Sequence, residues 1–228
     1  MISKKKFALL FLLAGCAAGP RPIPASANEI RRLSMAEDAL LYGNNMTATF
    51  ELDSKGENAA HMTGTLELVD GNAMHLVAEG NFKSEPVQVE LDSRDSSGIS
   101  RAATKGASVE SHRDPPASKL RHAVALGISR MGLLHNVVTL ALDKPIDKID
   151  GGFENWAKTI EVKDGASESI NGEVCKRVDF VVQVEGKKMG EASMCISDAT
   201  SLPLQRNMTV HFPEGDTTVI ETYKWTLK

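Results

Sequence analysis

The stretch Val174–Ile196, VCKRVDFVVQVEGKKMGEASMCI, decides the fold. Apolar and polar residues alternate on both sides of Val184-Glu185-Gly186, as in a β-hairpin with a three-residue loop. Such a loop places Gln183 opposite Lys187. The resulting register pairs Val174 with Ile196, Cys175 with Cys195, Val178 with Ala192 and Phe180 with Gly190. A single register therefore satisfies the turn, a pair of cysteines and an apolar face together.

The same alternation of apolar and polar residues runs through most of the chain. It predicts half-buried antiparallel strands over residues 47–52, 61–68, 74–82 and 87–91, and again from residue 160 to the end of the chain. Weaker strands are expected around Ile99 and Val109. The turn sequences Asp70-Gly71 and Pro213-Glu214-Gly215-Asp216 separate neighbouring strands.

Two segments carry helical spacing instead. The first is a short helix over residues 28–42, with Asn28 as its N-terminal cap and Gly43-Asn44 as its stop signal. Residues 117–142 carry one apolar stripe, and Gly132 within it predicts a bend or a split. The stripe consists of Leu120, Val124, Ile128, Met131, Leu134 and Val138. Many antiparallel strands with few helices indicate the α+β class.

The N-terminus has the form of an export signal. Lys4, Lys5 and Lys6 precede the apolar run 7–13, which is too short to cross a bilayer. The run ends in Leu13-Ala14-Gly15-Cys16, which resembles the lipobox of bacterial lipoproteins. That resemblance implies that residues 1–15 are a signal peptide and that Cys16 is acylated. An ordinary secretory signal that contains a cysteine is the alternative.

The remaining chain divides into a tether and one domain. Residues 16–27 are rich in proline and small residues, which favour a flexible, extended segment. Residues 28–228 are long enough for a single domain with its own core. Cys175 and Cys195 are the cysteines left after Cys16, and an even pair in an exported chain indicates a disulfide bond. In the predicted register this bond lies on the polar, outer side of the sheet.

Charge and composition exclude some classes of function. Removal of residues 1–15 changes the formal net charge from −4 to −7, and no basic run follows the signal. Proteins that bind nucleic acid need clustered Lys and Arg, so we expect no nucleic-acid partner. No later stretch has the 18 or so apolar residues of a membrane span, so the acyl groups are the expected membrane anchor.

The search for catalytic and metal sites is negative, and we expect no enzyme, no metal and no cofactor. The chain has no G-x-S-x-G, no H-E-x-x-H and no glycine-rich phosphate loop. Six histidines are scattered without metal-type spacing. His135 lies beside the expected helix break, where its imidazole fits a structural role better than a ligand or proton-transfer role.

The order of elements carries a family resemblance. A short helix, several antiparallel strands, central helices and further strands resemble the periplasmic lipoprotein carriers of the LolA and LolB type. The segment Asp198–Arg206, with Leu202-Pro203 at its centre, looks like the strand–turn–strand region that such proteins carry. The resemblance implies a curved antiparallel sheet, an incomplete β-barrel, whose open, concave side is covered by helices. It also implies an apolar space for acyl chains and no catalytic residues.

Two functions remain after this search. The first is an outer-membrane lipoprotein on the periplasmic side that binds a lipid, an acyl chain or a lipoprotein; Ala17 after the cysteine favours outer-membrane sorting by resemblance. Methionine on inward positions suits an adaptable apolar site, and the expected lining residues are Met62, Leu66, Met74, Leu76, Leu120, Val124, Ile128, Met131, Leu134 and Met194. The second is a non-catalytic envelope scaffold or protein-interaction module whose core is filled.

Overall fold

A computed structural model describes residues 27–71, 73–94, 99–104, 107–111, 117–134 and 157–228 of the chain. The predicted signal peptide, Cys16 and the tether up to residue 26 lie outside the described residues, as do His135 and Val138.

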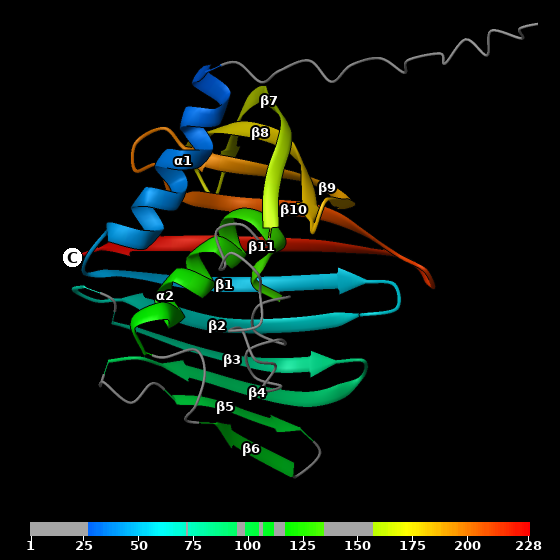
Figure 1. Cartoon of the computed structure of the whole chain (residues 1–228). Helices are drawn as coiled ribbons and strands as arrows, with labels where there is room; N and C mark the ends of the chain where they lie inside the picture. Colours follow the sequence, from blue (N-terminus) through cyan, green and yellow to red (C-terminus); the bar gives the residue numbers. More distant parts are fainter. Residues whose placement is uncertain (1–26, 72, 95–98, 105–106, 112–116, 135–156) are drawn as a thin grey trace, which may run out of the picture.

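Eleven strands form one open antiparallel sheet (Figure 1). Their spatial order is β6-β5-β4-β3-β2-β1-β11-β10-β9-β8-β7, so β6 and β7 are the edges and β1 pairs with β11 in the middle. The strands are β1 (Met46–Lys55), β2 (Ala60–Leu68), β3 (Met74–Phe82), β4 (Glu85–Asp92), β5 (Ile99–Thr104), β6 (Ala107–Ser111), β7 (Ala157–Ile170), β8 (Glu173–Val184), β9 (Lys187–Ser197), β10 (Pro203–Phe212) and β11 (Gly215–Leu227). The weak strands expected around Ile99 and Val109 are therefore present.

The helices lie together on one face of this sheet (Figure 1). They are α1 (Ala27–Tyr42), α2 (Ala117–Leu126) and a π-helical turn, η1 (Gly127–Met131), that continues α2. No described helix is long and apolar enough to cross a membrane. The predicted α+β class, with a curved open sheet and helices on its concave side, is confirmed.

Alternation along the strands buries two apolar clusters between the sheet and the helices. The first joins β1–β4 and β11 to the C-terminal half of α1 and to α2, with Leu40, Leu52 and Leu120 among its members. The second joins β7–β10 to the N-terminal half of α1, with Leu33 and Phe180 among its members. Each large side chain buried in this way contributes about 1.5–3 kcal/mol. The two clusters hold α1 across both halves of the sheet.

The register predicted for the β8–β9 hairpin is wrong by two residues. Val178 pairs with Met194 rather than Ala192, and Phe180 pairs with Ala192 rather than Gly190. At the far end, the partner of Cys175 is Ser197 and the partner of Ile196 is Lys176, and next to the turn the partner of Lys187 is Val184.

The turn explains this difference. Glu185 and Gly186 have φ of 48° and 78°, and they form a two-residue turn of the kind that matches strand twist. An irregularity between Val182 and Gln183 shifts the register by one further residue. Since side chains alternate with a period of two, a total shift of two leaves every residue on its predicted face. Val174 is an exception in burial, because it lies near the strand end and is 57% exposed.

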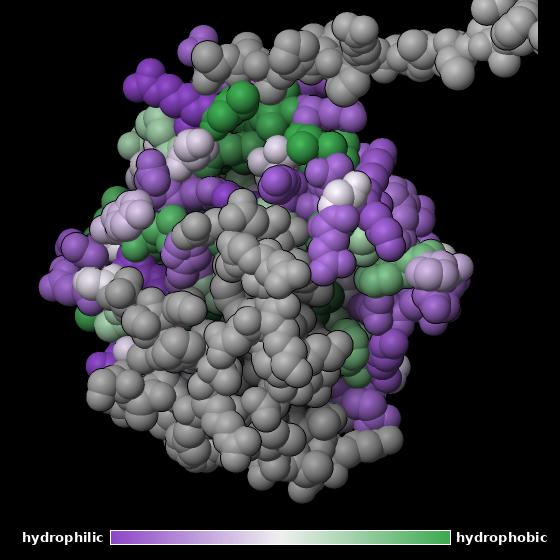
Figure 2. Space-filling model, viewed as in Figure 1, coloured by the Kyte–Doolittle hydropathy of each residue, from purple (hydrophilic) through white to green (hydrophobic). Residues whose placement is uncertain are grey.

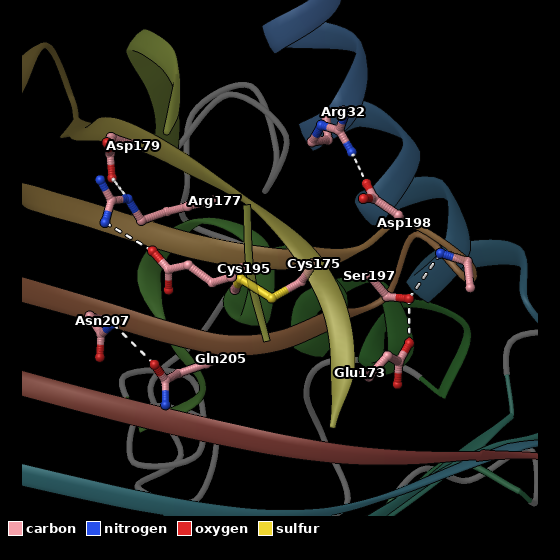
Figure 3. The surroundings of a disulfide bond; sticks show 12 residues. Arg32, Glu173, Cys175, Arg177, Asp179, Cys195, Ser197, Asp198, Gln205 and Asn207 are labelled. Carbon is pink, nitrogen blue, oxygen red and sulfur yellow. Dashed lines mark hydrogen bonds and ion pairs between the residues drawn. A yellow bond between two sulfur atoms is a disulfide. The ribbon is translucent and has the colours of Figure 1, made fainter. Parts of the chain in front are cut away.

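Cys175 and Cys195 are joined across β8 and β9, with an S–S distance of 2.07 Å and a Cα–Cα distance of 5.4 Å (Figure 3). Both lie on the convex face, as expected, and both are buried there. They pack against Leu204, with Trp225 partly covering the group. Arg177 lies beside them and reaches Glu168 at 3.0 Å and Asp179 at 3.2 Å.

We expect the double substitution Cys175→Ala and Cys195→Ala to lower the free energy of unfolding by about 3 kcal/mol. The reason is that the bond constrains a loop with a sequence separation of 20 in the unfolded chain. Urea-induced unfolding of the oxidised protein and the variant measures the change. Reduced wild-type protein is the matched control, because it loses the bond and keeps the side chains. Two free thiols in periplasmic protein, or equal unfolding free energies in all three samples, would contradict the disulfide.

Candidate functional site

All ten predicted lining residues lie on the concave side of the sheet, and each is at most 7% exposed. Eight belong to the first apolar cluster: Met62, Leu66, Met74, Leu76, Leu120, Val124, Ile128 and Leu134. Met131 and Met194 belong to the second cluster. The structure therefore brings these residues together in two neighbouring groups rather than one.

The helix over this face breaks where the sequence predicts. The α-helical pattern ends at Leu126, and the π turn that follows closes with a bond of 2.6 Å from the Gly132 N–H to the Gly127 carbonyl. Gly132 has φ of 97°, a conformation that favours glycine. Isolated π turns of this kind occur frequently at functional sites. The break therefore draws attention to the residues beneath it.

A buried polar group that the sequence analysis missed lies beneath the break. Arg206 on β10 and Glu221 on β11 are paired across the two strands, and both are at most 1% exposed. The Tyr223 hydroxyl donates to Glu221 Oε2 at 2.8 Å, and the Leu134 N–H donates to Glu221 Oε1 at 3.2 Å. Both carboxylate oxygens of Glu221 thus have partners from the sheet and from the segment above it.

Arg206 is less completely bound. Its Nη2 donates to the Arg130 carbonyl at 2.5 Å and lies 2.9 Å from Met208 Sδ. Within the described part of the chain, Nε and Nη1 meet no acceptor, and Arg206 makes no direct ion pair with Glu221. A buried donor without an acceptor costs about 1–3 kcal/mol. The structure therefore keeps an unfavourable group at the centre of its concave side.

Burial shifts the protonation of this group. It lowers the pKa of Arg206, with the nearby Glu221 charge acting in the opposite direction. It raises the pKa of Tyr223 well above the ordinary value, and the negative charge of Glu221 adds to that effect. Tyr223 is therefore a neutral donor to Glu221 at physiological pH.

A signal for this group exists in the sequence. Arg206 has the same phase as the inward-facing Met208, and Glu221 has the same phase as Val219 and Tyr223. A charge at an inward position of a strand is rarely buried without a partner. Because the two charges lie on consecutive strands, the position of the β10–β11 turn predicts that they lie opposite one another.

Arg121 shows how this protein satisfies a buried cation completely. It is 1% exposed, and its side chain donates only to backbone carbonyls. Nε reaches Leu40 at 3.1 Å, Nη1 reaches Val69 at 2.7 Å and Gly71 at 2.8 Å, and Nη2 reaches Gly43. Arg121 therefore ties α2 to the end of α1 and to the β2–β3 turn.

A second arginine fastens η1 from the other side. Arg130 donates to both carboxylate oxygens of Glu37 on α1, at 2.7 and 2.9 Å, and to the Ala157 carbonyl at 2.7 Å. The Ser129 hydroxyl donates to the same carboxylate at 3.0 Å. Bidentate pairs of this type are strong and directional. The π turn is thus held to α1 and β7 as well as to Arg206.

The convex face carries hollows and ion pairs of a different character. An open hollow of about 730 Å³ is lined by Lys163, Lys188, Glu191 and their neighbours on β7–β11. A second, of about 700 Å³, is lined largely by threonine and charged residues on β1–β3 and β11. None of the ten predicted lining residues borders either of these hollows.

Two groups of His, Asp and Glu on this face have ligand atoms within 4.8 Å of one another, and both are accounted for by ion pairs. His61 and Asp53 share a hydrogen bond of 2.8 Å, which raises the pKa of His61. His75 lies 3.0 Å from Glu90, while Arg94 binds Asp92 and lowers the pKa of that carboxyl group. We assign no metal to either group.

Comparisons with known proteins show similarity of fold alone. No family model and no curated protein sequence matches the chain. The MucA/MucB complex of Pseudomonas aeruginosa is 11% identical with a TM-score of 0.42, over 88% of this chain and 57% of that chain. A LolA superfamily protein from Nitrosomonas europaea is 8% identical with a TM-score of 0.27, over 88% and 93%. A DUF1329 family protein from Desulfovibrio piger is 9% identical with a TM-score of 0.33, over 87% and 92%.

The chain spans 56 to 59% of the MucB chains that it matches. Identities this low show no shared function. The order of elements from which the resemblance to LolA-type proteins was inferred, a helix, a run of strands, a second helix and further strands, is present in the described residues.

We expect Arg121→Met to lower the free energy of unfolding by about 3 kcal/mol, because it leaves several buried carbonyls without a donor. Arg31→Met is the matched control, since Arg31 is exposed on α1 and its loss should change stability by no more than about 0.5 kcal/mol. Urea unfolding measures both variants. Equal, small effects would show that Arg121 does not tie α1 to α2.

Proposed function

We propose that this chain is a non-enzymatic, lipid-anchored protein of the bacterial envelope that binds a lipid, an acyl chain or a lipoprotein. The ligand would lie between the concave face of the sheet and residues 117–134. The observation that carries the proposal is the concave side itself. Ten apolar residues from separate strands and from the broken helix meet there, and four of them are methionines.

Hydrophobic burial supplies enough energy for such binding. Each CH₂ group that leaves water contributes about 0.8 kcal/mol, so an ordinary acyl chain needs no charged anchor. Methionine side chains adapt their shape at low cost, which suits ligands of varied length. In Figure 2 hydrophobic atoms also gather at the surface over α1 and β7, at one end of this face.

The broken helix supplies a way to open the concave side. Residues 127–134 contain a π turn and a glycine with positive φ, and they are fastened to the sheet by the polar contacts of Arg206 and Glu221. Movement of residues 132–134 breaks the bond from the Leu134 N–H to Glu221, while Arg130 and Ser129 keep the π turn bound to Glu37 on α1. A ligand can then replace side chains that fill the space in its absence.

The anchor belongs to the same proposal. The lipobox resemblance of Leu13-Ala14-Gly15-Cys16 supports acylation of Cys16, and Ala17 supports sorting to the periplasmic side of the outer membrane. Residues 16–27 then provide the tether between the membrane and the domain.

The second candidate is a scaffold or protein-interaction module with a filled core. The low exposure of all ten residues favours it, because a dry core gives the same burial. A protein partner is a related possibility, since one structure of similar fold is a complex of MucB with MucA.

We expect Cys16→Ser to abolish incorporation of a fatty-acid label and to change processing of the signal peptide. The thiol is the group that receives the acyl chain in lipoproteins, and serine does not replace it. Metabolic labelling with a clickable fatty acid, followed by gel analysis, measures this. Labelling that survives the substitution would show that the predicted acylation of Cys16 is wrong.

We expect Met131→Asp to leave the domain folded and to weaken binding of a fluorescent fatty acid by about tenfold or more, because a carboxylate repels an acyl chain from an apolar site. Met35→Asp is the matched control, since Met35 is 44% exposed on α1 and should change neither property. Thermal unfolding and probe titration are measured together on the full chain carrying Cys16→Ser.

Native mass spectrometry of the same protein tests for co-purified lipid. A filled core predicts instead that Met131→Asp unfolds the domain. A wild-type domain that folds, binds no probe and carries no lipid would overturn the lipid-binding proposal and leave the scaffold.

A further inference from the structure

We propose that Arg206 recognises the carbonyl group of an ester-linked acyl chain, so that the concave site selects acyl lipids over chains of the same length that lack a carbonyl. This inference rests on the lipid-binding function proposed above and names its ligand class.

In the part of the chain that the structure describes, Arg206 has donor groups without a partner. Arg206 is completely buried, and within the described residues its Nε and Nη1 meet no acceptor. Two other arginines that fasten the helices to this face differ: Arg121 donates to four backbone carbonyls, and Arg130 is bound to Glu37 and to a carbonyl. Of these three, Arg206 is the one that keeps donor groups for an additional acceptor.

Glu221 is the carboxylate that pairs with Arg206 across the strands. Its Oε2 accepts from Tyr223 and its Oε1 accepts from the Leu134 N–H. The carboxylate is thus held away from the guanidinium by its own partners. It compensates the charge of Arg206 at a distance and leaves Nε and Nη1 unbound among the described residues.

Access of a ligand to Arg206 depends on Gly132. An ideal Cβ placed on Gly132 would lie 2.7 Å from Arg206 Nη1 and 2.9 Å from Glu221 Oε1. Gly132 therefore lies directly against the pair, and a side chain at this position would collide with both groups. In the proposal, a displacement of this one peptide, next to a π turn, gives a ligand access to Nη1.

Arg206 lies where the two apolar clusters meet, with Met208 of the second cluster on its own strand and Tyr223 of the first cluster on the next. A chain bound along either cluster can bring its polar end to this point. Acyl lipids have such a form, with an apolar chain that ends at a carbonyl.

The charge of the site favours a neutral acceptor over an anionic one. Arg206 and Glu221 together are neutral, so an added anion would leave one uncompensated negative charge in a buried site. A carbonyl adds an acceptor without adding charge. Arg121 shows that carbonyl oxygens alone satisfy a buried guanidinium in this protein. An ester carbonyl is therefore the ligand group that fits.

The test compares two neutral ligands of equal length, monolauroylglycerol, which has an ester carbonyl, and dodecylglycerol ether, which lacks it. Both are titrated below their micellar concentrations against the full chain carrying Cys16→Ser. We expect the wild-type sequence to bind the ester with an affinity at least about tenfold higher than its affinity for the ether. Arg206→Met should reduce the ratio of the two affinities to about one.

Each other outcome is decisive. Equal binding of ester and ether to the wild-type sequence overturns this inference and leaves the lipid-binding proposal intact, whereas binding of neither ligand overturns the proposed function. A preference that survives in Arg206→Met excludes the role of Arg206. Because the wild-type comparison needs no substitution, it stands even where Arg206→Met does not fold.

A third ligand and a second variant test the charge argument. Laurate should bind the wild-type sequence no more tightly than the ester. Glu221→Gln keeps the size of the side chain and removes its charge, so laurate should gain about tenfold relative to the ester in that variant. Laurate that outcompetes the ester tenfold in the wild-type sequence would show an anion site and overturn the carbonyl assignment.

Discussion

The pairing of β1 with β11 is the interaction on which the rest of the structure depends. It runs from Met46–Leu227 to Lys55–Thr218 and joins the first strand of the chain to the last. On one side lie β2–β6, and on the other lie β10–β7, each a succession of hairpins between neighbours in sequence. Without this one long-range pairing the two halves form no common concave face. Because such a contact closes a loop of almost the whole domain, we expect it to form late in folding.

Three arginines, of which Arg121 and Arg206 are buried and Arg130 is partly buried, then decide how the helices lie on that face. Arg121 ties α2 to the end of α1, and Arg130 ties the π turn to α1 and β7. Arg206 reaches up from the sheet to the same turn. The first two cations are fully supplied with acceptors and act as fixed points. Within the described residues, Arg206 retains unbound donors beneath Gly132, at the junction of the two apolar clusters.

Much of the fold could be predicted from local sequence. Period-two alternation located the strands, helical spacing with Gly43-Asn44 bounded α1, and Gly132 marked the break after α2. The faces of the β8–β9 hairpin were also predicted correctly, although its register was not. These features depend on residues close together in the chain, where steric preference and side-chain period act directly. The inward position of the ten predicted lining residues was predicted for the same reason, because it follows from alternation in the strands and from helical spacing in residues 117–134, and needs no knowledge of the partner element.

The amino-acid sequence by itself determined which residues turn inward, where the chain turns and where the helix breaks, because these depend on backbone preferences over a few residues. Only the tertiary structure decided which inward residues meet. The register of β10 against β11 places Arg206 beside Glu221, and the path of residues 127–134 places Gly132 over both. The same holds for Arg121, whose acceptors come from α1 and from the β2–β3 turn. Donors and acceptors far apart in the chain are matched only when the whole sheet has closed around them, and no local pattern carries that information.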